Sequence, residues 1–153
     1  MRSLELRVPP LAVVAVAAAL MWLLARAFPN PSLRFTAPWA LAGALIGLGA
    51  VITVSGVLAF RRAHTTVNPM TPDASSAVVS SGIYRITRNP MYLGFLFALA
   101  GWGLMLGHAL FVLPLAGYVL YMNRFQIGPE ERALEQKFGA EYTAYTQQVR
   151  RWI

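Results

Sequence analysis

The chain has no cysteine, only two histidines and only six acidic residues among its 153. The lack of cysteine excludes disulfides, thiol nucleophiles and thiolate metal ligands. Two histidines, His64 and His108, are too few for an ordinary histidine-based metal centre. The sequence therefore predicts no metal site, and its candidates for chemistry are carboxylates, arginines and tyrosines.

Charge of either sign is scarce, because 57% of the residues are hydrophobic and only 12% are charged. A water-soluble domain of this length would need more charge to cover its surface. The 13 basic residues outnumber the six acidic ones, giving a net charge of +7. In so apolar a chain this excess favours loops beside anionic lipid. The arginines are divided among the ends of apolar runs and do not form one stripe, so nucleic acid is not an expected partner.

Two apolar runs in the first third predict membrane-spanning helices. Residues 8–24 are longer than the 7–15 apolar residues of a usual signal peptide, so we favour a retained helix over a cleaved leader. Residues 37–60 carry no charge and are long enough to span the hydrocarbon core. Within this second run, Gly43, Gly47, Gly49 and Ala50 predict close packing against another helix.

A third apolar run, residues 91–125, is too long for one crossing and predicts two short spans of about 17 residues that turn near Gly107 and His108. The fold expected is an all-α integral membrane bundle of about four transmembrane helices, the last two forming a hairpin. Both termini and the 61–90 segment then share one side, with most of the arginines. Arg26 and Arg34 lie on the other side, so the first side is predicted to be cytoplasmic.

The composition changes after Gly128, where Pro129, Glu130 and Glu131 predict a new helix start. The apolar residues beyond it recur at helical spacing, which predicts an amphipathic helix on the cytoplasmic side, kinked or divided at Gly139. This stripe consists of Leu134, Phe138, Tyr142, Tyr145 and Val149. We expect one membrane domain, with two N-terminal helices in residues 1–62 and a core in residues 63–153.

Residues 80–94 place two arginines, two tyrosines and an Asn-Pro pair where a polar loop meets an apolar run. Arginine and tyrosine are favoured at the membrane boundary, so a simple interfacial anchor is one interpretation. Glu130 and Glu131 precede Leu134 by four and three residues, which places at least one carboxylate on the apolar side of the helix. That carboxylate needs helix capping or a salt bridge to Arg88 or Arg124.

Two motifs stand on either side of the apolar hairpin. The motif before it is Gly-Ile-Tyr-Arg-x-x-Arg-Asn-Pro-Met-Tyr-Leu-Gly, and the motif after it is Glu-Glu-Arg-x-Leu-Glu-x-x-Phe-Gly-x-Glu-Tyr-x-x-Tyr with a closing Val-Arg-Arg-Trp. Together with the hairpin, they resemble the isoprenylcysteine carboxyl methyltransferase and phospholipid methyltransferase superfamily. The resemblance covers about residues 64–153. It implies a multi-pass membrane enzyme, of the bacterial inner membrane with both termini cytoplasmic. The implied cofactor is S-adenosyl-L-methionine, bound on the cytoplasmic side and converted to S-adenosyl-L-homocysteine.

The resemblance also implies roles for individual residues. Glu130 would bind the ribose hydroxyls or a neighbouring polar group, and Arg124 is the arginine nearest to a position associated with substrate. On chemical grounds, Glu131 is the candidate to accept a proton if the methyl acceptor is a lipid amine. The implied catalytic residues are Arg124 and Glu131, and the implied cofactor-binding residues are Ser76, Ala77, Val78, Val79, Tyr84, Arg88, Asn89, Pro90, Met91, Tyr92 and Glu130.

Two positions depart from the family pattern. Asn89 replaces the motif histidine, and it can form hydrogen bonds but cannot titrate near neutral pH. Gln126 replaces a basic residue four positions before Glu130, which weakens the case for a prenylcysteine carboxylate. The expected acceptor is lipophilic or small: the carboxylate or thiol of an isoprenylcysteine-like compound, or a lipid amine. The alternative is a non-enzymatic membrane accessory protein that keeps the fold, and the oligomeric state is left open.

Overall fold

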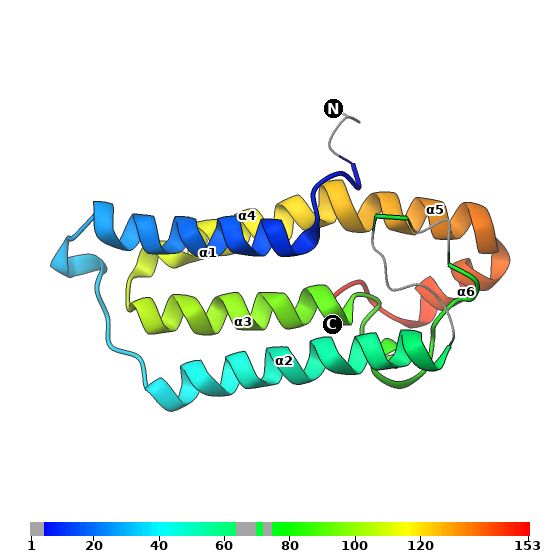
Figure 1. The fold of residues 1–153 in the computed structure, drawn as a ribbon, viewed down its shortest axis with the longest axis horizontal. Coiled ribbons are helices and arrows are strands. Elements are labelled where there is room, and N and C mark those ends of the chain that lie inside the picture. Colours follow the sequence, from blue (N-terminus) through cyan, green and yellow to red (C-terminus); the bar gives the residue numbers. More distant parts are fainter. Residues whose placement is uncertain (1–4, 64–69, 72–74) are drawn as a thin grey trace.

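The structure is a computed structural model that describes residues 5–63, 70–71 and 75–153. Every regular element in these residues is helical, as expected for the all-α class (Figure 1). The α-helices are α1 (Pro10–Ala27), α2 (Trp39–Arg62), α3 (Pro90–Leu106), α4 (Val112–Tyr121), α5 (Gly128–Phe138) and α6 (Ala140–Gln148). Helices α1 to α4 lie side by side, and α5 and α6 gather at one end of the bundle (Figure 1).

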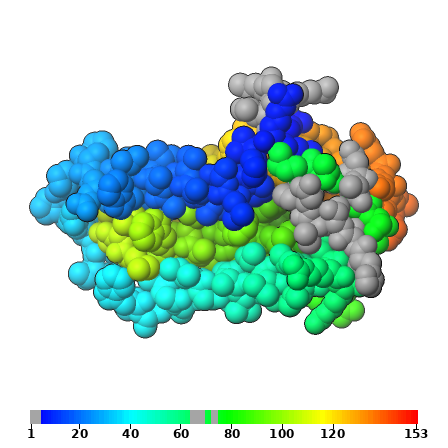
Figure 2. Space-filling model, in the orientation of Figure 1, coloured from blue at the N-terminus to red at the C-terminus, as the bar shows by residue number. Residues whose placement is uncertain are grey.

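Helices α1 and α2 are long and apolar enough to cross a membrane. In an apolar 18-residue stretch of each helix, only 22% (α1) and 17% (α2) is buried inside the protein. The core helix of a soluble protein would be mostly covered. Instead, large apolar side chains such as Leu11, Trp39 and Val51 are exposed. On the face shown in Figure 2, these two helices lie on either side of α3. Such exposed apolar surface fits a lipid environment. The crossing number of four stays a prediction.

Helices α2 and α3 approach closely through small residues, but not through all of those that the sequence indicated. A Cβ atom at Gly49 would lie 2.4 Å from the carbonyl oxygen of Gly94, so the two backbones touch. At Gly43 and Gly47 nothing lies within 4 Å of such an atom. The predicted role of those two glycines in packing is therefore wrong. Ala42, Gly49 and Gly56 are buried at intervals of seven residues, because seven residues make nearly two turns and so return to the same side of α2.

The hairpin turn lies at Gly107, where the sequence placed it. Gly107 ends α3 in the left-handed conformation, at φ = 59°, which glycine adopts without strain. Phe35 donates its backbone N–H to the Gly107 carbonyl at 3.0 Å, and His108 Nε2 lies 2.9 Å from the carbonyl oxygen of Phe28. The turn therefore holds the α1–α2 connection against the end of α3.

Replacing Gly107 with alanine should destabilise the protein by at least about 1–2 kcal/mol, the cost of a left-handed non-glycine residue. The new Cβ would also lie 2.6 Å from the carbonyl oxygen of Phe35. Thermal unfolding in detergent measures the effect. Gly117→Ala is the matched control, because nothing surrounds that position and alanine favours helix. Equal stability of both variants would contradict the tight turn.

No break separates α4 from α5. A π-helical segment, Met122–Ile127, joins the two helices, and the Gly128 N–H bonds to the Asn123 carbonyl. Helix α5 begins at Gly128 with Pro129, Glu130 and Glu131 in its first turn, which confirms the predicted helix start, although the preceding helix leads directly into it. A wider turn just before a proline relieves the clash between its ring and the carbonyl four residues earlier, so the helix can continue through Pro129.

The C-terminal apolar stripe packs on the protein. Gly139, at φ = 51°, separates α5 from α6, which confirms the predicted division. Tyr142, Tyr145 and Val149 are buried in a cluster that also contains Ala59, Val79 and Tyr84. These stripe residues therefore cover the end of α2 and the segment before α3, where the sequence analysis had expected a membrane-facing surface.

Candidate functional site

The candidate site lies where the segment before α3 meets α5 and the residues that follow α6. Three hydrogen bonds join the segment before α3 to the residues that follow α6. Arg88 N donates to the Arg150 carbonyl at 3.0 Å, Asn89 Nδ2 to the Arg151 carbonyl at 2.9 Å, and Thr87 Oγ1 to the same carbonyl at 3.3 Å. The chain terminus is thus fixed beside the Asn-Pro motif, although Asn89 and Arg151 are 62 positions apart in the sequence.

Glu130 is one of two carboxylates in this site. The Tyr92 hydroxyl and the Gln126 amide both donate hydrogen bonds to its Oε1 atom. Burial raises the pKa of Glu130 to about 7, while the two hydrogen bonds oppose that rise because they favour the carboxylate. Near neutral pH the Glu130 carboxyl can therefore accept a hydrogen bond or exchange a proton.

Glu131 lies between two guanidinium groups. Arg88 Nη2 is 2.9 Å from Oε1, and Arg151 contacts both carboxylate oxygens. The hydrogen bond to Glu131 raises the pKa of Arg151. Arg88 also donates from Nη1 to the Thr146 carbonyl at 3.0 Å, whereas its buried Nε atom has no hydrogen-bond partner among the residues that the structure describes. Glu131 therefore ties α5 to both neighbouring segments, and Arg88 keeps one donor free.

Arg124 does not join this cluster. Its Nη1 lies 3.1 Å from Glu5 Oε1, and Arg132 Nη2 lies 2.6 Å from Glu5 Oε2. Both arginine side chains are more than half exposed. Of the two salt bridges that the sequence analysis considered for the carboxylate pair, the structure forms the one to Arg88, and it places Arg124 with the N-terminal segment.

The other predicted cofactor residues occupy two environments. Val79 and Tyr84 are buried in the aromatic cluster, where Tyr145 donates to the Tyr84 carbonyl at 2.7 Å and burial raises the pKa of the Tyr84 hydroxyl. Pro90 is the first residue of α3, which places Met91 and Tyr92 in its first turn. Among the others, Ser76 is exposed, while Ala77 and Val78 are half-buried. Parts of the predicted loop, residues 64–69 and 72–74, lie outside the described residues.

Sequence reasoning missed three residues that build the site: Thr87, Asn123 and Arg151. It noted Gln126 only as a departure from the family pattern, although the spacing of four residues on one helix predicts its contact with Glu130. Asn123 accepts a hydrogen bond from the Trp152 indole at 3.0 Å, and this second anchor of the chain terminus depends on tertiary contact alone.

Comparisons with known proteins identify the family. The profile of a family described as phospholipid methyltransferase matches residues 38–141. The chain belongs to the phospholipid methyltransferase family. The match begins just before α2, and so it includes a helix that the sequence motifs left outside the resemblance. No solved structure gives a significant match.

Among relatives, protein-S-isoprenylcysteine O-methyltransferase B of Arabidopsis thaliana is 30% identical over 105 residues, covering 69% of this chain and 53% of the relative. Methanethiol S-methyltransferase 2 of Bradyrhizobium diazoefficiens is 41% identical over 68 residues, covering 44% of this chain and 25% of the relative. An uncharacterized protein of Haemophilus influenzae is 49% identical over 63 residues, its whole length and 41% of this chain. This family member thus spans about half the length of the plant relative.

The raised pKa of Glu130 predicts a pH dependence of stability. The folded protein holds the Glu130 proton up to about pH 7, whereas the unfolded chain releases it near the ordinary pKa of 4.5. The free energy of unfolding should therefore be highest below pH 4.5 and fall as the pH rises to about 7. Denaturant unfolding of wild type and Glu130→Gln across this range measures it. Parallel curves for the two proteins would contradict the assignment.

Proposed function

We propose that this family member is an integral membrane methyltransferase that uses S-adenosyl-L-methionine and methylates a lipophilic or small acceptor. The observation that carries the proposal is the pair of adjacent carboxylates, with Glu130 held by Tyr92 and Gln126 and Glu131 held by Arg88 and Arg151. The names of the relatives support the reaction type. The substrates in those names belong to those proteins.

The residues present fit the proposed cofactor, which carries a carboxylate, two ribose hydroxyls and an adenine ring. The free Nε donor of Arg88 is buried, which is costly unless a ligand acceptor satisfies it. Glu130 offers carboxylate oxygens to hydroxyl groups, and Val79 and Tyr84 supply an apolar and aromatic wall. The bound cofactor would supply an electrophilic methyl group on a sulfonium centre.

The task of the chain is then to align the acceptor and exclude water. Such positioning can lower the activation barrier by roughly 7–11 kcal/mol. Transfer of a methyl group to an amine or a thiol breaks the sulfur–methyl bond, forms a bond from methyl to the acceptor, and releases one proton. Glu131 is engaged by two guanidinium groups, so we assign proton acceptance to Glu130, whose pKa of about 7 suits that role. This moves proton acceptance from Glu131, the candidate of the sequence analysis, to Glu130.

The contacts favour a neutral acceptor over a carboxylate. An anionic acceptor beside two glutamates needs a cation, yet Arg88 and Arg151 already pair with Glu131, and Arg124 pairs with Glu5. A thiol or a lipid amine needs no such partner. We therefore place these two acceptor classes ahead of an isoprenylcysteine carboxylate.

We place the site on the cytoplasmic face of a bacterial inner membrane. Arg61 and Arg62 end α2 at this end of the bundle, and Arg85 precedes α3, whereas Arg26 and Arg34 lie at the other end. The positive-inside rule then orients the protein with both termini in the cytoplasm.

Calorimetric titration of S-adenosyl-L-methionine, and separately of S-adenosyl-L-homocysteine, into detergent-purified protein tests the proposal. Saturable binding of both is expected, followed by methylation in a screen of small thiols, prenyl thiols and lipid amines with a labelled methyl donor. Absence of binding to folded protein would overturn the proposal and favour the non-enzymatic accessory protein.

A further inference from the structure

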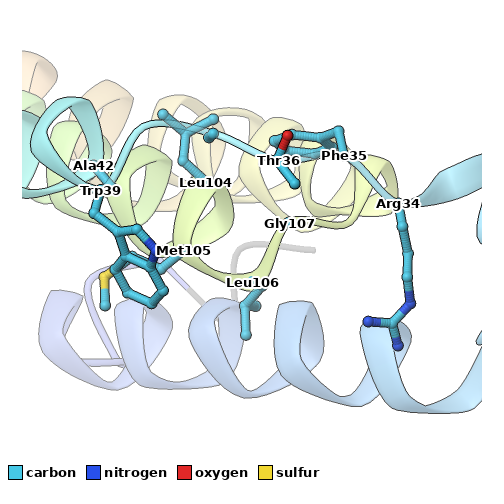
Figure 3. Close-up of a pocket in the computed structure, with 10 residues that line it drawn as sticks. Arg34, Phe35, Thr36, Trp39, Ala42, Leu104, Met105, Leu106 and Gly107 are labelled. Carbon is cyan, nitrogen blue, oxygen red and sulfur yellow. The ribbon is translucent and has the colours of Figure 1, made fainter.

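A second site lies at the other end of the bundle. A cavity of about 550 Å³ is lined by the α1–α2 connection, the first turn of α2 and the end of α3 (Figure 3). Tyr92, the partner of Glu130, and Leu104, which lines the cavity, are both on α3 and lie roughly 18 Å apart, at 1.5 Å per residue over about 12 residues. The cavity is therefore distinct from the proposed methyltransferase site. Its lining residues are Arg34, Phe35, Thr36, Ala37, Trp39, Ala42, Leu104, Met105, Leu106 and Gly107.

The lining combines one cation with apolar side chains. Arg34 stands at one end of the lining in Figure 3, and Trp39 and Met105 stand together at the other, with Leu106 between them. Arg34 is exposed, and no ion pair forms on it in the part of the chain that the structure describes. The cavity thus offers a free guanidinium to an anion and an apolar surface to a chain attached to that anion.

The local charge also favours an anionic ligand. The acidic residues that the structure describes lie just before α1, on α5 and on α6, all at the opposite end (Figure 1). At the cavity end the charged side chains in the described ranges are Arg26 and Arg34, and Arg26 lies over the ring of Trp22, 5.4 Å from its centre. No carboxylate there competes with a ligand for Arg34.

The depth of the cavity identifies the class of ligand. Trp39 is the first residue of α2, a helix apolar enough to cross the bilayer, and it is 71% exposed. A tryptophan at the end of such a helix belongs at the headgroup level. Arg34, five residues earlier, then lies at the depth of lipid phosphates, with the apolar lining extending toward the acyl chains.

We propose that this cavity binds an anionic phospholipid, whose phosphate contacts Arg34 and whose acyl chain packs against Trp39, Met105 and Leu106. The turn at Gly107 builds the site, because the Arg34–His108 bridge and the Phe35–Gly107 hydrogen bond hold the connection against the end of α3. The lipid would stabilise the outer end of the bundle by filling the cavity. This inference is independent of the proposed methyl transfer.

Native mass spectrometry of detergent-purified protein, titrated with dioleoyl phosphatidylglycerol or dioleoyl phosphatidylcholine, tests the inference. We expect wild-type protein to retain one phosphatidylglycerol tightly. Retention should be roughly tenfold weaker in Arg34→Gln, because this variant loses one charge-assisted contact to the phosphate. Arg26→Gln is the matched control, an arginine at the same end that does not line the cavity, and it should retain the lipid. Leu104→Trp, which fills the cavity, should also lose the lipid while unfolding at the temperature of the lipid-free wild type.

Three results would overturn the inference: equal retention of the two lipids, an equal loss in Arg26→Gln and Arg34→Gln, or full retention in Leu104→Trp. If inorganic phosphate displaced the lipid at a concentration equal to that of the lipid, Arg34 would be assigned to a free anion, and the lipid assignment would be overturned. Titration of S-adenosyl-L-methionine into Arg34→Gln, which should match wild type, keeps failure of this inference separate from failure of the proposed function.

Discussion

Replacing Glu130 with alanine should weaken the binding of S-adenosyl-L-methionine by roughly 10- to 100-fold, the effect of losing one or two hydrogen bonds to a charged acceptor. The change would also leave the Tyr92 hydroxyl and the Gln126 amide without their shared partner. Methyl transfer should fall further, because the same carboxyl is assigned as the proton acceptor. Calorimetric titration gives the first quantity, and turnover with a labelled methyl donor gives the second.

The controls separate chemistry from folding. Glu141→Ala removes an exposed carboxylate of α6 and should bind the cofactor as wild type does. Glu130→Gln keeps the side-chain shape, so folded protein with weak turnover would point to the lost carboxylate. Wild-type affinity and turnover in Glu130→Ala would exclude this residue from both roles.

Replacing Glu131 with alanine should lower the free energy of unfolding by about 2–3 kcal/mol, somewhat less than for a fully buried ion pair. Arg88 and Glu131 are only 13% and 18% exposed, so the change leaves the Arg88 guanidinium largely buried without its carboxylate. Arg151 loses the same partner, and with it one contact that holds the chain terminus against α5. Denaturant unfolding in detergent measures the loss, and limited proteolysis of the C-terminus reports release of the last residues.

Glu135→Ala is the matched control for this second prediction, since it removes an exposed carboxylate from the same helix. Its unfolding should match wild type within about 0.5 kcal/mol, as for most surface substitutions. A double variant, Arg88→Met with Glu131→Leu, removes both charges and should recover part of the lost stability. If Glu131→Ala unfolds like Glu135→Ala, the ion pairs do not hold the site together.

Some of the site could be foreseen from local pattern. Pro90 begins α3 and Tyr92 lies in its first turn, so residues 80–94 lie where a loop meets an apolar helix, as the sequence analysis predicted. The Glu130–Gln126 contact spans four residues of one helix and was within reach of the same reasoning. The pairing of Arg88 with Glu131 was one of the alternatives considered, and only the folded chain selected it over Arg124.

Other features depend on distant segments. No sequence pattern indicated that Arg151 would clamp Glu131 or that Glu5 would engage Arg124, because those pairs are 20 and 119 residues apart. The helix start at Pro129 was predicted correctly from local pattern, but the π-helical turn that joins α4 to α5 without a break was not predicted. Gly43 and Gly47 were chosen by spacing, whereas the face that α2 turns toward α3 depends on how the two helices pack.

By itself, the sequence determined the helical class, the apolar spans, the hairpin turn at Gly107 and the family motifs. Each of these is a property of consecutive residues, namely hydropathy, helical period or a residue type that a backbone conformation requires. The tertiary structure alone decided which charges pair, which face of α2 is buried, and that a free arginine borders a cavity far from the motifs. Those outcomes depend on which distant segments share a volume, and side chains there compete for the same partners only once the helices have packed.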